Sequence, residues 1–541
     1  MERGDCNMES LNQLHKRSQT SKTASLLPSD TNLLSLHHDN GVRDDVALES
    51  NPPPVLPTEA VQFAVGSKRR LAIIVFIVLS NMVQMVSNMV GLAAGLEISK
   101  ALGVPVGPGK ANWAAASYPL TQGTFVLVSG RLGAVYGHRN VLVVGAVWLV
   151  AWSLGNGFCE SYVSFNIVRA FSGIGGALIM PNAVALIGTT IPPGRMRNIT
   201  LGFFGASAPI GGLLGAVWAG IFVQFATWKW IFWGLAIVGA CVFGVLAYLL
   251  PNDHPVDQGG RIDYVGAALG TGGLVLFNVA WNQAPASGWN AFFEPLLLIV
   301  SLALFGAFPI WEHRFAGSSP IMPLDIWTAP SFAALLGAVL LSFMANGIFL
   351  WYMVAWLQLL EGRSVLQFSA DWTPFAVVAT AGTFVAAWLI PRLAAQWILA
   401  IGSLSILISN VLLGTKPVFE TYWARLFPAT VLMGLCPDFV YVAAQIVASN
   451  SVSRRHQGVA ASLISTLNLY GTSLGLGFAG TVETQVNLHR TDSVLGFRAA
   501  LFFGAGIALL AMLLVGLFVR VPKDQREGWD DPADAAMAQV G

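Results

Sequence analysis

The 541-residue sequence has few charged residues. Asp, Glu, Lys and Arg together make up 11% of the chain, against about 25% in soluble domains. The net charge of +1 at pH 7 gives no basic surplus that would attract nucleic acid. Only four cysteines occur, and their wide spacing predicts neither a disulfide framework nor a metal site. We therefore expect no metal, no cofactor and no nucleic-acid partner.

Catalytic motifs are also missing. The glycines do not form a phosphate-binding loop followed by Lys and Ser or Thr, and no His or Cys cluster has the spacing of metal ligands. The Ser, His and Asp residues between the apolar runs are scattered. A membrane enzyme is therefore the weakest functional hypothesis, and we expect no catalytic residues.

Apolar runs dominate the rest of the chain, which is 55% hydrophobic with a mean hydropathy of +0.64. A membrane helix needs roughly 20 mainly apolar residues. Fourteen runs approach that length, and they cover residues 71–95, 112–134, 140–159, 163–190, 199–224, 228–250, 263–283, 292–312, 329–359, 368–391, 394–415, 424–449, 457–483 and 497–519. The pattern predicts an all-α polytopic membrane protein, the kind of chain that moves a solute across a bilayer.

Polar segments flank these runs. Residues 1–67 are rich in Ser, Asn and Asp and predict a disordered tail, and residues 520–541 predict a second, shorter one. An even number of spans puts both tails on one side, and the loops on that side hold most of the Lys and Arg residues. Because such residues stay in the cytosol, we expect both termini to be cytosolic.

Two charged residues, Arg169 and Asp438, fall deep inside expected spans. A charge at mid-membrane costs about 2.5–3.5 kcal/mol on insertion scales, so it normally faces a partner or a watery cavity. A buried ion pair or an arginine tied to backbone is the structural alternative. We favour function for both residues, because intramembrane charge is functional by default.

Asp438 shares a helix face with Gly434, Tyr441 and Gln445, at steps of four, three and four residues. A polar stripe on a membrane helix lines a cavity or a seam between helices rather than meeting lipid. The proton affinity of a carboxyl group there would depend on the side of the membrane that it faces. Asp438 is therefore our candidate proton carrier, with Arg169 either tuning it or binding an anionic group.

The first span carries a second polar face. Asn81, Gln84 and Asn88 follow one another at steps of three and four, so they can hydrogen-bond a ligand or a neighbouring helix. Both interpretations stay open. Asn346 in the ninth span is a lone, weaker candidate for the same cavity.

Two further stripes consist mostly of small residues. One, in the fifth span, is free of side chains larger than a methyl group and predicts close packing of helices; its members are Gly205, Ala208, Gly212, Gly215 and Ala219, with Pro209 beside them. The thirteenth span repeats the idea, and we interpret it as packing too; its members are Ser465, Asn468, Thr472, Gly475 and Ala479.

With these motifs in view, the chain resembles the major facilitator superfamily, in particular its fourteen-span drug:proton antiporter branch. Residues 130–139 are similar to the family's cytosolic Gly-x-Leu-x-Asp-x-x-Gly-basic-basic motif, matched by Gly130, Leu132, Gly137 and Arg139. Ala134 stands where the family has Asp. In the family that Asp helps to latch the cytosolic gate, so the resemblance implies a weaker or differently built latch.

Other segments extend the resemblance. Arg169 with Gly173 is similar to the family's Arg-x-x-x-Gly motif, whose Arg is linked to proton coupling, and residues 205–220 with Pro209 resemble its antiporter motif. Residues 281–285, 437–438 and 470–475 resemble a fungal subgroup: the yeast aminotriazole- and boron-resistance exporters and their low-affinity ammonium-transporter relative.

The resemblance implies a major facilitator fold with 14 transmembrane helices, arranged as 6+2+6. The disordered tail would be residues 1–67, the first six-helix bundle 68–250, a linker with two extra helices 251–328, the second bundle 329–519 and the cytosolic tail 520–541. In the family's twelve-span members, helices 1, 4, 7 and 10 line the central cavity. Those correspond here to spans 1, 4, 9 and 12, which carry the polar residues named above.

We therefore expect a proton-coupled secondary transporter, most simply an efflux pump for a drug, toxin or fungal metabolite. It would act as a monomer in the plasma membrane, with the vacuolar membrane as the alternative. Its partners would be a small-molecule substrate, protons and the lipid bilayer. The first rival is a facilitator or uptake carrier for a small species such as ammonium or borate. The second is a membrane sensor that transports nothing.

Overall fold

The computed structural model describes residues 66–520, apart from 105–106, 192–194, 252–254, 256, 258, 316–319, 323–325, 328–330, 391, 453–456 and 489–492. Nearly all of the two tails expected over 1–67 and 520–541 therefore lies outside the described residues. The helices belong to one compact unit of the chain.

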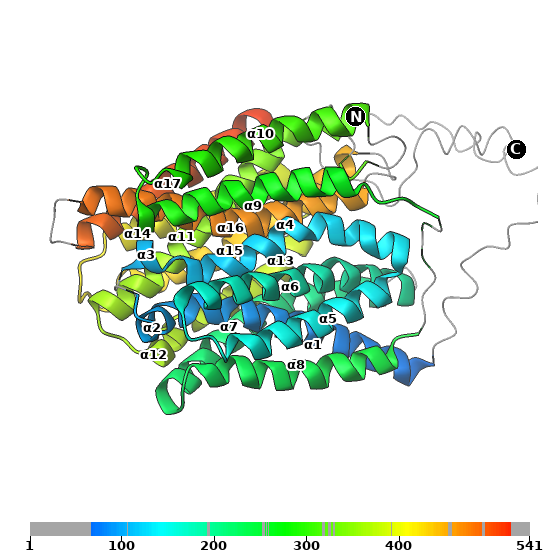
Figure 1. The fold of residues 1–541 in the computed structure, drawn as a ribbon, viewed down its shortest axis with the longest axis horizontal. Coiled ribbons are helices and arrows are strands. Elements are labelled where there is room, and N and C mark those ends of the chain that lie inside the picture. Colours follow the sequence, from blue (N-terminus) through cyan, green and yellow to red (C-terminus); the bar gives the residue numbers. More distant parts are fainter. Residues whose placement is uncertain are drawn as a thin grey trace, which may run out of the picture. The chain divides into compact units, whose positions relative to one another are not determined.

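The first half of the chain forms six long helices and two short ones (Figure 1). They are α1 (Ser67–Ala93), α2 (Gly95–Ala101), α3 (Pro108–Ala111), α4 (Trp113–Tyr136), α5 (His138–Asn156), α6 (Tyr162–Thr190), α7 (Arg195–Phe225) and α8 (Lys229–Leu249). Below we call these the first helix group.

A two-helix hairpin, α9 (Tyr264–Ser287) and α10 (Phe293–Arg314), separates this group from the second helix group. That group contains α11 (Phe332–Ala355), the π-helical turn η3 (Trp356–Leu360), α12 (Val365–Asp371), α13 (Thr373–Leu389), α14 (Ala395–Gly414), α15 (Leu426–Ser451), α16 (Gln457–Asn487) and α17 (Ser493–Phe518).

Local sequence sets several of the helix ends. Ser161 caps α6, where its hydroxyl accepts a hydrogen bond from the backbone N–H of Ser164, 3.2 Å away, and such a cap satisfies a donor that the first turn leaves free. Gly137 separates α4 from α5 at a φ of 93°, a left-handed conformation that favours glycine. The motif glycine is thus required by the sharp turn at this point.

Each of the fourteen expected intervals holds a helix, but not all of these helices are strongly apolar. Among the described residues, eleven helices are long and apolar enough to cross a membrane, and the bent pair α12–α13 makes a twelfth if it forms one span. The helices in the second and third intervals, α4 and α5, are not among them. The chain is thus an all-α, multi-pass membrane protein, whereas a count of fourteen crossings is not established.

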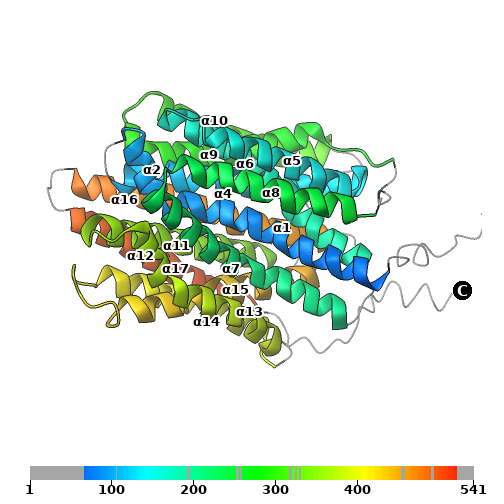
Figure 2. The same ribbon diagram turned by 90° about the horizontal axis from the view of Figure 1, so that it is seen from below.

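The helices of each group pack mostly on one another. In the first group α1 packs along α7, and α6 lies between α4 and α5; in the second, α14 packs on α15 and α17, and α11 on α16 and α17. Two seams join the groups: α4 packs along α16, with α9 touching both, and α7 packs along α12 and α13. Figure 2 shows α7 beside α1 and on the side facing α13.

The two ends of the helices differ. We call the end where α1 starts and α17 finishes the terminal end, and the other the distal end. Figures 1 and 2 show the short helices α2 and α12 at the distal end. There the two groups touch closely: the Gln358 amide donates to the carbonyl of Ala93 at 2.8 Å, and the ring of Trp351 lies against Gly95. We call these contacts between the groups the distal seal.

Buried charges reinforce the second group at the distal end. Glu361 pairs with the buried Lys416 and, at 3.0 Å, with Arg363, which also pairs with Asp371 at 2.5 Å. The Tyr422 hydroxyl donates to the carbonyl of Asp371, and burial raises the pKa of this tyrosine. These contacts tie η3, α12 and the loop before α15 together, and all of them lie within one group.

Candidate functional site

A cavity of about 2740 Å³ lies between the two helix groups. Its walls come from α1, α4, α6 and α7 on one side and from α11, α13, α15 and α16 on the other. The lining extends to Arg131, His138 and Arg261 at the terminal end. Toward the distal end it stops at apolar side chains, including Leu92, Leu350 and Trp372. The cavity is therefore open toward the terminal end and closed by the distal seal.

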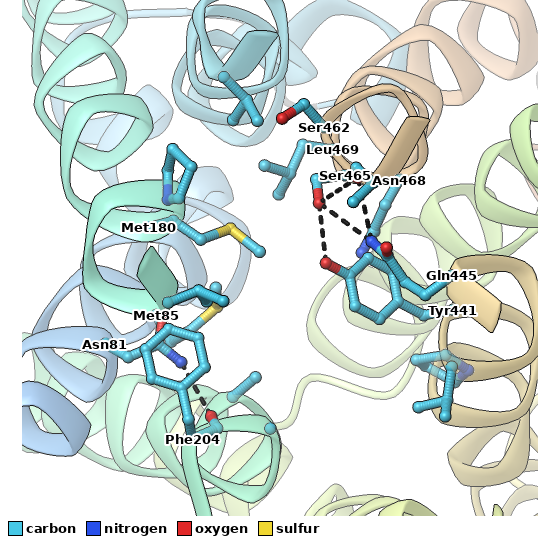
Figure 3. A pocket seen from close by; sticks show the side chains of 18 of the residues that line it. Asn81, Met85, Met180, Phe204, Tyr441, Gln445, Ser462, Ser465, Asn468 and Leu469 are labelled. Atoms are coloured by element: carbon cyan, nitrogen blue, oxygen red, sulfur yellow. Dashed lines mark hydrogen bonds between the residues drawn. The ribbon is translucent and has the colours of Figure 1, made fainter. Parts of the chain in front are cut away.

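The second helix group supplies a polar wall to the cavity. The Tyr441 hydroxyl and the Ser465 hydroxyl lie 2.8 Å apart, and the Gln445 amide donates to the carbonyl of Ala461 at 3.0 Å. Figure 3 shows Tyr441, Gln445, Ser465 and Asn468 gathered on this wall. Hydroxyl and amide groups with spare hydrogen-bonding capacity can here meet a solute.

Asp438 lies on the same wall, one helical turn from Tyr441. Its Oδ1 accepts a hydrogen bond from the Thr383 hydroxyl of α13 at 2.9 Å. Its Oδ2 is shielded from solvent and has no partner among the described side chains and backbone groups. A buried carboxylate oxygen without a donor is costly when the group is ionised. The arrangement thus provides a carboxyl group that can hold a proton at the cavity wall.

The first helix group presents a different surface. Figure 3 shows Met85, Met180 and Phe204 on the wall across from Tyr441. The Asn81 amide lines the cavity but donates to the carbonyl of Phe204 at 3.1 Å and to the Ser207 hydroxyl at 2.7 Å. This wall is therefore mainly apolar, with its polar groups bonded to neighbouring helices.

The predicted polar face of α1 is divided between two environments. Gln84 is fully buried away from the cavity; its amide donates to Asn81, and its carbonyl oxygen accepts from Gln122 of α4 at 3.0 Å. Asn88, in contrast, lines the cavity, as does Asn346, whose Oδ1 lacks a partner among the described residues. The interpretation as contacts between helices thus holds for Asn81 and Gln84, whereas ligand binding by Asn88 stays a prediction.

Arg169 lies outside the cavity lining. It is fully buried, donates to the Ser87 hydroxyl at 3.2 Å and to the Ser87 carbonyl at 2.8 Å, and stacks over the ring of Tyr118. Neither Arg169 nor Asp438 takes part in an ion pair among the described residues. The structure does not bring them into contact, so the expected direct tuning of one by the other has no geometric support.

The motif glycines stand where helices approach closely. A side chain at Gly173 would collide with the Tyr118 carbonyl of α4, and one at Gly215 would lie 2.8 Å from the Val86 carbonyl of α1. Gly205 and Gly212 face the other group instead, at Thr383 and Trp372, and Pro209 between them lines the cavity. The α7 stripe thus packs against both helix groups.

The 130–139 motif also contacts segments far along the chain. Arg139 donates to the carbonyl of Ala247, and its neighbour His138 hydrogen-bonds Asn182 at 2.8 Å. Gly130 lines the cavity, and Leu132 is partly buried in the last turns of α4. The motif therefore joins the start of α5 to α6 and α8 at the terminal end.

A carboxylate stands beside this motif although Ala134 replaces the family's Asp. Asp257, in the connection between α8 and α9, pairs with Arg131 at 2.7 Å. Its backbone N–H donates to the carbonyl of Ala134, and Arg131 also donates to the carbonyl of Arg261, both at 3.0 Å. The acid beside Arg131 thus comes from another segment of the chain rather than from the motif itself.

Sequence reasoning missed two features of this region. The α16 stripe is more than packing, because Ser465, Asn468 and Thr472 line the cavity; the polar residues at helical spacing were the signal. Glu483 is a third deep charge, since α16 continues to Asn487 and leaves it only 6% exposed. The expected span ends at residue 483, so Glu483 was not recognised as a buried charge.

Comparisons with known proteins agree with this architecture. Residues 76–475 match the Major Facilitator Superfamily. The chain is 34% identical over 421 residues to the low affinity ammonium transporter of Saccharomyces cerevisiae, covering 76% of this chain and 81% of that one. It is 33% identical over 458 residues to efflux pump terJ of Aspergillus terreus, covering 82% and 88%. It is 31% identical over 447 residues to the aminotriazole resistance protein of S. cerevisiae, covering 81% and 82%.

Solved structures share the fold. A POT family transporter in complex with 5-aminolevulinic acid superposes with a TM-score of 0.61 at 14% identity, covering 83% of this chain and 95% of that one. The family match spans most of the chain, and the expected resemblance is confirmed. The chain belongs to the Major Facilitator Superfamily and is a multi-pass secondary transporter of small molecules, not an enzyme.

Proposed function

We propose that this transporter is a proton-coupled exporter of small organic compounds that works by alternating access. One observation carries the proposal. Asp438 lies in the wall of a cavity between two helix groups, and one of its carboxylate oxygens has no partner among the described residues. Rocking the groups about such a midplane site would expose it to each side in turn. Asp438 would then load and release its proton on opposite sides.

The proposed topology completes this picture. All fourteen long helices would cross the membrane, as bundles 68–250 and 329–519 with the α9–α10 pair in the linker 251–328. The excess of Lys and Arg at the terminal end supports a cytosolic location for that end and for both termini. The cavity would then face the cytosol in this structure. We propose a monomer in the plasma membrane, with the vacuolar membrane as the alternative.

Cavity size favours an organic substrate. Pockets for drug-sized ligands occupy about 300–1,000 Å³, and this cavity, at about 2740 Å³ with its open mouth, exceeds that range. Its apolar wall at Met85, Met180 and Phe204 and its polar wall at Tyr441 and Gln445 suit an amphipathic molecule. Relatives named as efflux pumps support the same direction. Asn81, Asn88 and Asn346 would add polar contacts.

Arg169 has a different place in the proposal. Its two bonds to Ser87 join α6 to α1, the helix that carries Asn81 and Asn88. It would act on proton coupling through the position of α1 and through its charge, rather than by pairing with Asp438. The motif glycines and Pro209 would allow the helices to slide as the groups rock.

A second candidate is an uptake carrier for a small species such as ammonium. A relative named as a low affinity ammonium transporter favours it. A screen in pump-deficient yeast expressing the chain separates the two, using borate, aminotriazole, methylammonium and a panel of fungal metabolites. Resistance with a lowered cell content of one compound supports export. Sensitivity to methylammonium with raised uptake instead supports the carrier.

The proton role is tested with the compound that this screen identifies. In vesicles containing purified protein, Asp438→Asn should lower transport driven by a pH gradient by at least about tenfold, or 1.4 kcal/mol. Exchange of labelled substrate in the absence of a gradient should persist, because it needs no net proton movement. Asp438→Glu, which keeps a carboxyl group, is the matched control. Gradient-driven transport at the wild-type rate in Asp438→Asn would overturn the coupling proposal.

A further inference from the structure

Glu483 is a buried carboxylate that the proposed mechanism does not yet use. It lies in α16 near the distal end, is 6% exposed, and its Oε2 accepts a hydrogen bond from the Tyr352 hydroxyl of α11 at 2.7 Å. Tyr352 is fully buried, and its ring packs edge-on against Phe497 of α17. Glu483 is therefore buried and held by specific contacts with neighbouring helices, rather than exposed at a helix end.

The same carboxylate also faces the other helix group. Its Oε2 lies beside Gly109 of α3. A methyl group built on Gly109 would come within 3.1 Å of that oxygen and 3.2 Å of the Gly480 carbonyl. Glu483 thus sits under the distal seal, where α3 closes over α16 and α11.

No cation among the described residues forms an ion pair with Glu483. Lys110 of α3 is the nearby basic residue, but it is exposed and forms no ion pair with Glu483 among the described residues. The other groups that face Glu483 are the neutral Tyr352 of α11 and the Gly109 backbone, and the adjoining faces of α17 and α9 present Phe497 and Pro285. A carboxylate buried without a paired cation costs free energy, which protonation removes.

We propose that Glu483 is a second proton-binding group of this transporter, which binds a proton as the distal seal closes over it and releases it when the seal opens. In the open state water would solvate the carboxylate and favour its ionised form. Linkage then makes the effect reciprocal: if closure favours proton binding, a bound proton favours closure. Low pH therefore stabilises the closed seal, and rising pH favours the open one.

This inference rests on the proposed export by proton exchange and adds a group that controls closure of the outer side. After releasing its substrate outward, an exporter must close its outer side only when a proton has been taken up. Glu483 would impose that order, because the seal closes readily over a neutral carboxyl group and poorly over a charged one. Asp438 at the cavity wall would remain the group that carries the proton to the inner side.

Opening of the distal seal can be measured without any substrate. Spin labels at Lys100→Cys and Leu488→Cys, both exposed near the seal, report its width by pulsed electron paramagnetic resonance in purified protein without native cysteines. The background is Asp438→Asn, so that only other groups titrate. The pH is varied between about 5 and about 9, a range that brackets the pKa values of ordinary and buried carboxyl groups. Over this range the population of long distances should rise at least about threefold, which on a logarithmic scale is roughly half of a tenfold change.

Glu483→Gln should make that population independent of pH, whereas Glu483→Asp should keep the response with a shifted midpoint. Glu294→Gln is the matched control, because Glu294 is a fully buried glutamate at the distal end of α10; it should respond as the background does. A full pH response in Glu483→Gln, its absence in the background, or its loss in Glu294→Gln would each overturn the proposal. Failure of gradient-driven transport with this response intact would instead refute the proposed function.

Discussion

Arg169 and Asp438, the two charges that the sequence places deepest in the helices, have opposite surroundings. Arg169 is fully buried among α1, α4 and α6, where Ser87 accepts two hydrogen bonds from it and Tyr118 lies under its guanidinium group. Asp438 lines the cavity and has one bond, from Thr383. Both terminal nitrogens of Arg169 are bonded to Ser87, although its Nε has no partner among the described residues, whereas Asp438 faces the cavity with capacity for a proton.

The two helix groups repeat this contrast. Gln84 of the first group donates to Asn81 and accepts from Gln122, so α1 uses its polar side chains to hold neighbouring helices. In the second group, Tyr441 and Gln445 contact Ser465 while all three also line the cavity. A deep polar residue thus indicates function only where its neighbours leave part of it unsatisfied and facing the cavity.

Removal of Arg169 should have the largest effect. Arg169→Ala removes the side-chain donor to the Ser87 carbonyl and hydroxyl and opens a cavity beneath Tyr118, and hydrogen bonds to charged groups contribute about 1.5–3 kcal/mol each. We expect a loss of about 3–5 kcal/mol, a large share of the roughly 5–15 kcal/mol of a folded protein. Thermal unfolding of the purified protein measures it. Arg169→Lys, which keeps the charge, should lose less.

The opposite outcome would change the assignment of roles. If Arg169→Ala unfolded at the wild-type temperature but no longer transported against a pH gradient, Arg169 would act in coupling after all. The contrast between the two charges would then be one of position only.

Sequence patterns predicted the positions of the helices along the chain better than the contacts between helices. Long apolar runs suffice to place helices such as α11 and α17, because burial in lipid depends on composition along the chain. Contacts between helices depend on residues hundreds of positions apart. The pairing of Gln84 with Gln122, which removes Gln84 from the cavity, leaves no trace in the spacing of α1.

The same limit explains the other differences. Ser465 and Asn468 have the spacing of a packing stripe and of a cavity wall alike, so only the position of α16 decides between them. Glu483 lies at the edge of an apolar run, and it is α3, from the other helix group, that buries it. Asp257 comes more than 120 residues after Arg131 in sequence.

A smaller effect is expected from the polar wall of the cavity. Tyr441→Phe removes a hydroxyl from the cavity wall, and a net hydrogen bond contributes about 0.5–1.5 kcal/mol, so KM for the exported compound should change by roughly two- to tenfold. Thermal stability should change little, since Ser465 keeps its bond to the Ala461 carbonyl. Gln84→Ala is the counterpart in the first helix group and, because Gln84 lies away from the cavity, should lower stability while leaving KM nearly unchanged. The reverse result for the pair would remove the distinction.

The smallest effect concerns the terminal end, where the acid next to Arg131 comes from another segment. The Arg131 and Asp257 side chains are 26% and 43% exposed, and exposed ion pairs contribute about 0–1 kcal/mol. Asp257→Ala should therefore change the transport rate by no more than about fivefold. Ala134→Asp places a carboxylate one turn from Arg131 on α4, at a spacing that allows an ion pair. Added to Asp257→Ala, it should restore the rate if a negative charge beside Arg131 is what matters. No restoration, with both variants equally well folded, would assign the effect to the backbone contact between Asp257 and Ala134 instead.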